Sequence, residues 1–244
     1  MARTITAGAI VVGNEILSGK VADTNSPFLA KQLRAAGVSL DRIVVIADDI
    51  DVIAEAVRAM SGSYDLVFTS GGVGPTHDDV TIAGVAKALD REVVRHAELA
   101  RSLREHFGDK TDDALLRLAD VVEGTELVAD GALEFPTFLV DNIYVLPGIP
   151  EIFQHKVAAI RGRFTTDPFH LRMVYVREHE TVIADALDET LKAFPELLLG
   201  SYPKLNNPEY KVRLTLESKD VDYVEAALGK LLELLPANAV VRQE

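Results

Sequence analysis

One short segment carries the densest set of side chains that could do chemistry. It reads Ser70-Gly71-Gly72-Val73-Gly74-Pro75-Thr76-His77-Asp78-Asp79 and follows an apolar stretch at residues 65–69. Its glycines permit positive φ angles and a close approach of the backbone to a ligand. Where such a loop joins a strand to a helix, its N–H groups and the helix N-terminus stabilise phosphate oxygens. A plain glycine-rich turn is the alternative, but the added proline, carboxylates and threonine favour a phosphate site formed by Gly71, Gly72, Gly74, Pro75, Thr76 and Thr81.

Adjacent carboxylates at Asp78 and Asp79 create an electrostatic conflict beside a phosphate loop. They would repel an anionic ligand unless a cation lay between the like charges. Magnesium takes oxygen ligands and commonly joins one or two carboxylates to substrate phosphates, so a divalent metal, Mg²⁺ or a similar ion, resolves the conflict. The alternative role is N-capping of the next helix, which Asp performs well. We expect one carboxylate to cap that helix, with support from Thr81, and the other to meet ligand or metal.

Polar side chains also follow the other apolar segments. Asp48 and Asp49 end the stretch 43–47, and Pro147-Gly148 ends a later one. Because the carboxyl ends of parallel strands meet at one edge of a sheet, these groups should converge on the glycine loop. For Glu15 and Asp49 a rim position or an N-cap is an equally good explanation, and for Pro147-Gly148 a tight turn is. The further ligand contacts predicted at this edge are Asn14, Glu15, Thr24, Asn25, Pro147 and Gly148.

The elements that must position these groups alternate between strands and helices. Apolar runs of strand length at 5–12, 43–47 and 65–69 indicate buried strands. Between them lie helical periodicities, the first with Ser26 as N-cap and Pro27 in its first turn. This alternation predicts a mostly parallel sheet covered on both faces, a three-layer α/β sandwich. The region after the loop adds helices at 97–107 and 112–121 and a hairpin with strands at 138–140 and 143–146.

The pattern of elements changes near Thr165-Thr166-Asp167-Pro168. Beyond this point the order βαββαβ is typical of a ferredoxin-like domain. We therefore predict a nucleotide-binding α/β domain over residues 1–166 and a small α+β domain over residues 167–244. The elements expected in the second domain are strands at 170–177, 197–201, 210–217 and 239–242 and helices at 182–194 and 221–235.

Composition narrows the classes of function. Cysteine is absent, which excludes disulfides, zinc–thiolate sites and cysteine nucleophiles. The formal net charge is −13, with no basic block, which argues against nucleic acid as a partner. No apolar run approaches the roughly 20 residues of a membrane span, and no signal peptide is visible. We expect a soluble cytoplasmic protein that binds neither nucleic acid nor membrane, with a small nucleotide or pterin phosphate as its ligand.

These motifs together resemble the molybdopterin-binding (MoaB/MogA-like) domain family, and within it the CinA-like branch. The region after the first domain, notably Gly200-Ser201-Tyr202-Pro203, is similar to the corresponding segment of CinA proteins and of eukaryotic FAD synthase. The amidase domain of CinA proteins and the transferase domain of FAD synthase have no counterpart, so the chain looks like a stand-alone version. The matching motifs are Gly13-Asn14-Glu15-Ile16-Leu17-Ser18-Gly19, Asp23-Thr24-Asn25, Gly71-Gly72-Val73-Gly74-Pro75-Thr76-His77-Asp78-Asp79-Val80-Thr81 and Leu146-Pro147-Gly148.

The resemblance implies two directions for function. The wider family binds molybdopterin and takes part in adenylating it, with carboxylates matching Asp48 and Asp79 in the site. The CinA-like branch, with its Gly-Pro-Thr-x-Asp-Asp loop, is associated with divalent-metal-dependent hydrolysis of nucleotide pyrophosphates such as ADP-ribose and FAD. In this branch Asp79 and Asp48 would be catalytic and, with Asp78, would hold the metal. Asn14 departs from the aspartate common at that position and removes one carboxylate.

We therefore expect a metal-dependent nucleotide pyrophosphatase acting on ADP-ribose, FAD or a similar dinucleotide. The doubled Asp78-Asp79 favours this reading. A molybdopterin-binding protein of molybdenum cofactor biosynthesis and a non-catalytic ligand-binding module are the alternatives. The resemblance also implies a homo-oligomer.

Overall fold

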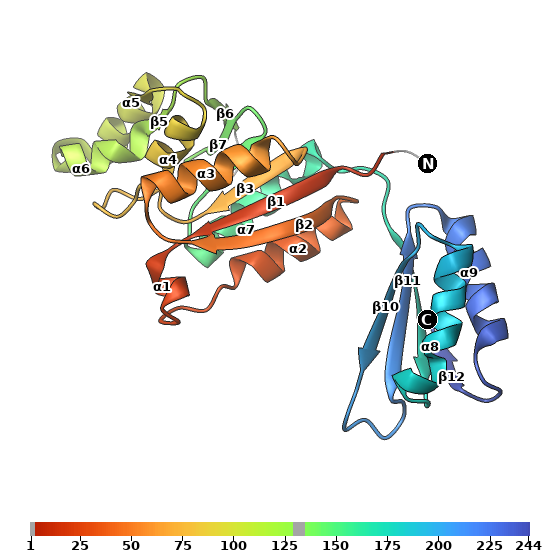
Figure 1. Cartoon of the computed structure of the whole chain (residues 1–244). Coiled ribbons are helices and arrows are strands. Elements are labelled where there is room, and N and C mark those ends of the chain that lie inside the picture. The colour runs from red at the N-terminus through yellow and green to blue at the C-terminus, as the bar shows by residue number, and fades with distance from the viewer. Residues whose placement is uncertain (1–2, 129–134) are drawn as a thin grey trace. The chain divides into compact units, whose positions relative to one another are not determined.

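The computed structural model describes residues 3–128 and 135–244. Within them the chain forms two compact units, residues 3–166 and residues 167–244 (Figure 1). In the part of the chain that is described, no helix combines the length and apolar character needed to cross a membrane.

A six-stranded sheet forms the centre of the first unit, in the order β2-β1-β3-β8-β7-β6. Strand β1 pairs in parallel with β2 and with β3, and β3 pairs in parallel with β8. The two remaining pairs, β8 with β7 and β7 with β6, are antiparallel. The mostly parallel sheet predicted from the sequence is therefore confirmed. The strands are β1 (Thr6–Val12), β2 (Ser39–Ile46), β3 (Leu66–Ser70), β6 (Glu126–Val128), β7 (Thr137–Val140) and β8 (Ile143–Leu146).

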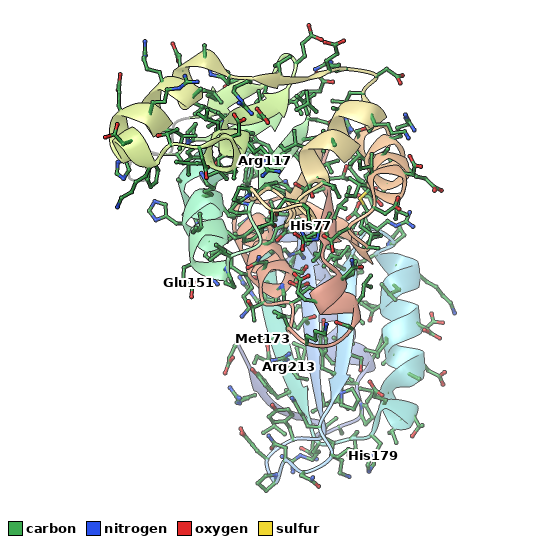
Figure 2. All side chains as sticks on the ribbon, turned by 90° about the vertical axis from the view of Figure 1, so that its left-hand side faces the viewer. His77, Arg117, Glu151, Met173, His179 and Arg213 are labelled. Atoms are coloured by element: carbon green, nitrogen blue, oxygen red, sulfur yellow. The ribbon has the colours of Figure 1, made fainter. Side chains whose placement is uncertain are left out.

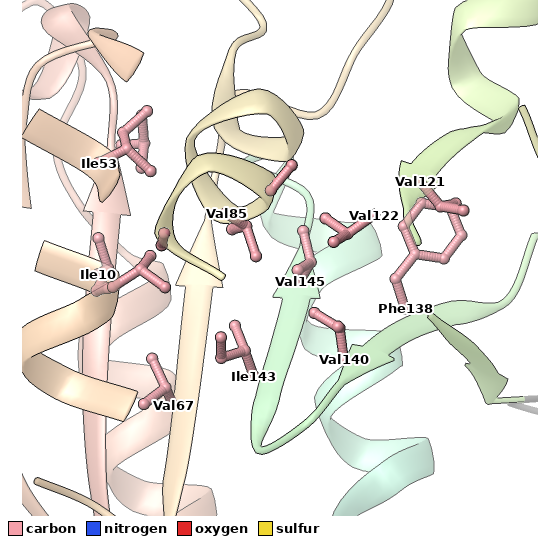
Figure 3. Packing of buried hydrophobic residues seen from close by; sticks show 14 of the residues in the cluster. Ile10, Ile53, Val67, Val85, Val121, Val122, Phe138, Val140, Ile143 and Val145 are labelled. Atoms are coloured by element: carbon pink, nitrogen blue, oxygen red, sulfur yellow. The ribbon is translucent and has the colours of Figure 1, made fainter. Parts of the chain in front are cut away.

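Two apolar cores lie on opposite faces of this sheet. Alternate residues of β1 point to each face, so Ile10 and Val12 belong to one core and Ala7 and Ala9 to the other. The first core packs against α3 and α4 (Figure 3), and the second against α2 and α7. This is the predicted three-layer sandwich, visible in Figure 1. The helices are α1 (Asn14–Leu17), α2 (Asn25–Ala35), α3 (Ile50–Ser61), α4 (Thr81–Ala88) and α7 (Pro150–Ile160), followed by the 3-10 turn η3 (Arg161–Arg163).

Two local predictions in this unit are wrong. The strand expected at 43–47 was predicted to be buried, but it belongs to the edge strand β2, and its Ile43 is 44% exposed. An apolar run does not reveal whether a strand lies at the centre or at the edge of a sheet. Helix α2 begins at Asn25 rather than after Ser26. The carboxylate of Asp23 accepts hydrogen bonds from the N–H groups of Asn25 and Ser26, both 3.0 Å, and so takes the capping role.

The segment between α4 and the hairpin also differs from its prediction. Helix α5 (Ala97–Phe107) lies where it was expected, followed by the 3-10 turn η1 (Gly108–Lys110). The helix expected at 112–121 is instead a short α6 (Asp113–Leu116), a 3-10 turn η2 (Arg117–Ala119) and strand β5 (Asp120–Val122). Strand β5 pairs with β4 (Val93–Arg95), a tertiary contact that overrides the helical spacing of its apolar residues.

The second unit is a four-stranded antiparallel sheet in the order β10-β11-β9-β12. Its core joins strand residues such as Val174 and Leu214 to Ile183 and Leu231 of the two helices. The predicted small α+β domain of ferredoxin-like order is confirmed. Its elements are β9 (His170–Val176), α8 (Glu180–Ala193), β10 (Leu198–Pro203), β11 (Val212–Ser218), α9 (Val221–Leu234) and β12 (Val240–Gln243).

Candidate functional site

The loop that follows β3 requires glycine at two consecutive positions. Gly71 has φ +104° and Gly72 has φ +65°, values that residues with a Cβ rarely adopt. A Cβ on Gly71 would collide with the carbonyl oxygen of Val12, and one on Gly72 would collide with the hydroxyl of Thr81. The glycines therefore let the loop pass directly over the end of β1 and the start of α4.

Thr81, the first residue of α4, holds the loop in place through two hydrogen bonds. Its side chain is fully buried, and its hydroxyl donates a hydrogen bond to the carbonyl of Gly71 (2.8 Å). Its backbone N–H donates to the carbonyl of Gly72 (2.9 Å). Thr81 thus positions the loop instead of capping α4, the role expected of it.

The paired carboxylates act on the loop and not on the helix. The N-cap residue of α4 is Val80, without a side-chain cap, so the prediction that Asp78 or Asp79 caps this helix is wrong. Asp79 accepts a hydrogen bond from the N–H of Thr76 (2.8 Å), and both carboxylates accept from the Thr76 hydroxyl. The hydrogen bond from the Thr76 hydroxyl to Asp78 lowers the pKa of the Asp78 carboxyl below its ordinary value. A Cβ on Gly74 would touch the Asp79 carboxylate, which places this charge against the glycine loop.

A cavity of about 680 Å³ opens beside the loop. This volume lies within the range of small-molecule sites. Its polar lining comes from the glycine loop, from the carboxylate residues Glu15 and Asp79, and from Lys156. The rest of the wall is largely apolar. The complete lining is Glu15, Gly71, Gly72, Val73, Gly74, Pro75, Asp79, Leu118, Phe135, Pro136, Phe138, Val145, Pro147, Gly148, Ile149, Ile152 and Lys156.

Asn25 connects the end of β3 to the turn before α7 by two hydrogen bonds of its side chain. It is 6% exposed, and its Nδ2 donates to the hydroxyl of Ser70 (3.0 Å) and to the carbonyl of Gly148 (2.9 Å). Gly148 in turn lies so close to Gly71 that a Cβ on it would be 3.2 Å from the Gly71 Cα. Asn25 therefore positions the turn before α7 against the glycine loop, without lining the cavity itself.

The remaining predicted site residues lie outside the cavity lining. Asp48 accepts a hydrogen bond from the N–H of Asn14 (2.7 Å), and Asp49 caps α3 through the N–H groups of Asp51 and Val52. Asn14 and Thr24 are exposed, and Thr76 and Asp78 are loop residues that the lining does not include. Over residues 3–128 and 135–244, no group of at least three His, Asp or Glu side chains is arranged to hold a metal, so Asp48, Asp78 and Asp79 are not gathered together.

Sequence reasoning missed the lysine in the cavity wall. Lys156 is 5% exposed, and its Nζ donates to the carbonyl of Phe135 (2.6 Å). A signal was present, because Phe153, Val157 and Ile160 mark the inward face of α7 and Lys156 falls on the same face. The apolar lining residues Leu118, Phe135, Phe138 and Ile152 gave no comparable signal, since in a sequence they look like ordinary core residues.

Comparisons with known proteins agree with this fold. A family described as probable molybdopterin binding domain matches residues 8–161, and the FAD synthase middle domain matches residues 168–244. A protein of Archaeoglobus fulgidus is 37% identical over 93% of this chain and 96% of its own length. A probable FAD synthase of Caenorhabditis elegans is 31% identical over 96% of this chain, which spans only 51% of that relative.

Solved structures are similar as well, among them that of a CinA protein. The crystal structure of the protein CinA, with unknown function, from Thermoplasma acidophilum has a TM-score of 0.61 and 28% identity, and the match covers 66% of this chain and 98% of that one. The three-layer sandwich and the match over residues 8–161 place the first unit in the class of probable molybdopterin binding domains. The chain belongs to the probable molybdopterin binding domain family, and its first unit is similar to the protein CinA.

Proposed function

We propose that this chain is a divalent-metal-dependent pyrophosphatase acting on ADP-ribose, FAD or a similar dinucleotide. The observation that carries the proposal is the position of Asp79, whose carboxylate stands against the glycine loop in the wall of the same cavity. A carboxylate and a set of backbone N–H groups side by side suit a ligand that is both anionic and metal-bound. The similarity to a probable FAD synthase supports a dinucleotide as the ligand class.

The backbone of the loop is the part of the site that holds phosphate. The N–H of Gly71 already donates to the carbonyl of Leu146 (3.2 Å). We therefore assign the phosphate contacts to the N–H groups of Gly72, Val73 and Gly74. The N-terminus of α7 faces the same cavity through Gly148 and Ile149 and adds its partial positive charge. These backbone groups can offset the charge of a diphosphate in a chain whose net charge is −13.

The carboxylate residues of the cavity lining would hold the proposed magnesium-like ion. Magnesium binds through one or two carboxylates together with substrate phosphates, and Asp79 and Glu15 are the carboxylate residues of the lining. An ion held there would neutralise the diphosphate and activate a water molecule for attack on phosphorus. The N–H and hydroxyl of Thr76 fix the Asp79 carboxylate, so this charge is oriented before any ligand arrives.

Binding of molybdopterin without hydrolysis is the second candidate. It is favoured by the match of residues 8–161 to the probable molybdopterin binding domain. The cavity also suits a pterin, because a planar ring can lie against Phe135 and Phe138 while its phosphate meets the glycine loop. Such a protein would serve in molybdenum cofactor biosynthesis.

Incubating the purified chain with ADP-ribose, FAD and related dinucleotides separates the two candidates. Each substrate is tested with Mg²⁺, Mn²⁺, Co²⁺ and a chelator, and the products are resolved by chromatography. We expect metal-dependent addition of water across the diphosphate, which gives AMP and ribose 5-phosphate from ADP-ribose. Absence of hydrolysis with every metal, together with tight binding of molybdopterin, would replace this proposal by the second candidate.

A further inference from the structure

Among the residues that the structure describes, Lys156 brings a charged group into the otherwise apolar part of the cavity wall. The Nζ of Lys156 and the carbonyl oxygen of Phe135 lie 2.6 Å apart, joined by a hydrogen bond. Lysine is rarely buried this deeply, because removing an ammonium from water is costly. A buried lysine that lines a ligand cavity, and not only the core, points to a role in recognising the ligand.

The backbone of Lys156 lies about two turns along α7 from the helix N-terminus that flanks the expected phosphate position. Gly148, Ile149, Ile152 and Lys156 follow the cavity along α7, starting from the helix N-terminus beside Gly71. At 1.5 Å per residue, the backbone of Lys156 lies roughly 10 Å along the axis from Ile149, and its side chain leans back toward the N-terminus. That separation suits the base of a nucleotide whose phosphate is held by the glycine loop.

The wall around Lys156 also suits a planar ring. Phe135 and Phe138 line the cavity with their ring centroids 5.8 Å apart, and Leu118 and Ile152 add aliphatic surface. Aromatic faces bind flat heterocycles by stacking and by burying apolar area. A ribose would lose its water here and gain few hydrogen bonds from the aromatic and aliphatic side chains in return.

We propose that Lys156 and the Phe135 carbonyl read the edge of a purine base, with adenine as the base that fits. The ammonium donates to a ring nitrogen while the carbonyl accepts from the neighbouring amino group. Adenine presents such an acceptor beside a donor, at N7 and the 6-amino group. Because the two protein atoms lie only 2.6 Å apart, both can face neighbouring atoms of a single base edge. Lys156 is thus a specificity-determining residue. This role rests on the proposed function in one respect only, namely that the ligand is a nucleotide.

Equilibrium binding of three ligands tests this assignment. AMP carries the whole edge, purine riboside 5′-monophosphate lacks the amino group, and ribose 5-phosphate lacks the base. Wild type is compared with Lys156→Met and with Lys31→Met, which removes the same charge from an exposed position of α2. We expect Lys156→Met to weaken AMP binding roughly 10-fold or more, because a hydrogen bond from a charged group contributes about 1.5–3 kcal/mol. Binding of ribose 5-phosphate should change little, and Lys31→Met should change nothing.

The outcomes are distinct. An equal loss for AMP and ribose 5-phosphate would assign Lys156 to the phosphate, and no loss for either would remove it from the site; both results overturn the inference. If Lys156→Met does not fold, wild type alone decides, since equal affinity for AMP and for purine riboside 5′-monophosphate contradicts edge recognition. Base-dependent binding without any dinucleotide hydrolysis would defeat the proposed function and leave this inference standing. Hydrolysis that ignores the base would do the reverse.

Discussion

The side chain of Asn25 donates a hydrogen bond to the carbonyl of Gly148, across 123 residues of sequence (2.9 Å). The same nitrogen donates to the hydroxyl of Ser70 (3.0 Å). One buried amide thus connects the start of α2, the end of β3 and the turn before α7, and so fixes the turn against the glycine loop.

Asn25→Ala should damage both stability and ligand binding. It leaves the Ser70 hydroxyl and the Gly148 carbonyl without their amide donor, which costs about 1–3 kcal/mol. The melting temperature should fall by roughly 2–10 °C. Asn142→Ala is the matched control, because the Asn142 amide donates to the carbonyls of Ser61 and Tyr64, and none of these residues lines the cavity. Only Asn25→Ala should weaken nucleotide binding; equal effects of both variants on affinity would contradict the positioning role.

Gly71→Ala should destabilise the first unit far more than Gly19→Ala does. Both glycines have positive φ, so both variants carry a conformational cost of about 1–2 kcal/mol. At Gly19 a Cβ enters open space, whereas at Gly71 it meets the carbonyl oxygen of Val12. We expect urea unfolding to show at least about 2 kcal/mol of additional destabilisation for Gly71→Ala. Equal midpoints for the two variants would show that the loop relaxes away from β1.

Asp65 should make stability depend on pH. The N–H of Thr6, and secondarily the Thr6 hydroxyl and Arg3, hold the pKa of Asp65 below its ordinary value, against an opposing effect of burial. Because the pKa is lower in the folded state, the ionised group stabilises the fold above the unfolded pKa of about 4 and loses this effect as the pH falls through the folded pKa. The difference in free energy of unfolding between wild type and Asp65→Ala should be full at pH 6 and shrink below about pH 4. A constant difference down to pH 3 would contradict this assignment.

The sequence predicted the fold class because its signals were local. Apolar runs, helical periodicities and the glycines of the loop each report on a few neighbouring residues, and together they specified a parallel sheet with the loop at a strand end. The edge position of β2 and the pairing of β4 with β5 escaped prediction, since both depend on contacts between distant segments. Asp23 replaced Ser26 as the capping side chain for a local reason, because either residue type can cap a helix.

The candidate site was predictable only in part. Gly71, Gly72, Gly74, Pro75, Glu15, Asp79, Pro147 and Gly148 were named from the sequence and do line one cavity. Their chemical roles stay predictions, as do those of Asp48 and Asp78. Asn25 and Thr81 were expected to touch ligand, but the structure shows them supporting the wall through hydrogen bonds to Gly148 and Gly71. A sequence pattern does not separate a polar group that supports the wall from one that contacts the ligand, because both follow strand ends.

The rate of ADP-ribose hydrolysis by Asp79→Asn, measured beside wild type with the best divalent metal, tests the central claim most directly. Asparagine keeps an oxygen that can accept from the Thr76 N–H, so the melting temperature should stay within about 4 °C of wild type. The lost charge should lower the rate roughly 100-fold or more, about 3 kcal/mol of barrier. Asp109→Asn, exposed in η1, is the control and should hydrolyse as wild type does. Equal rates for Asp79→Asn and wild type would contradict the account.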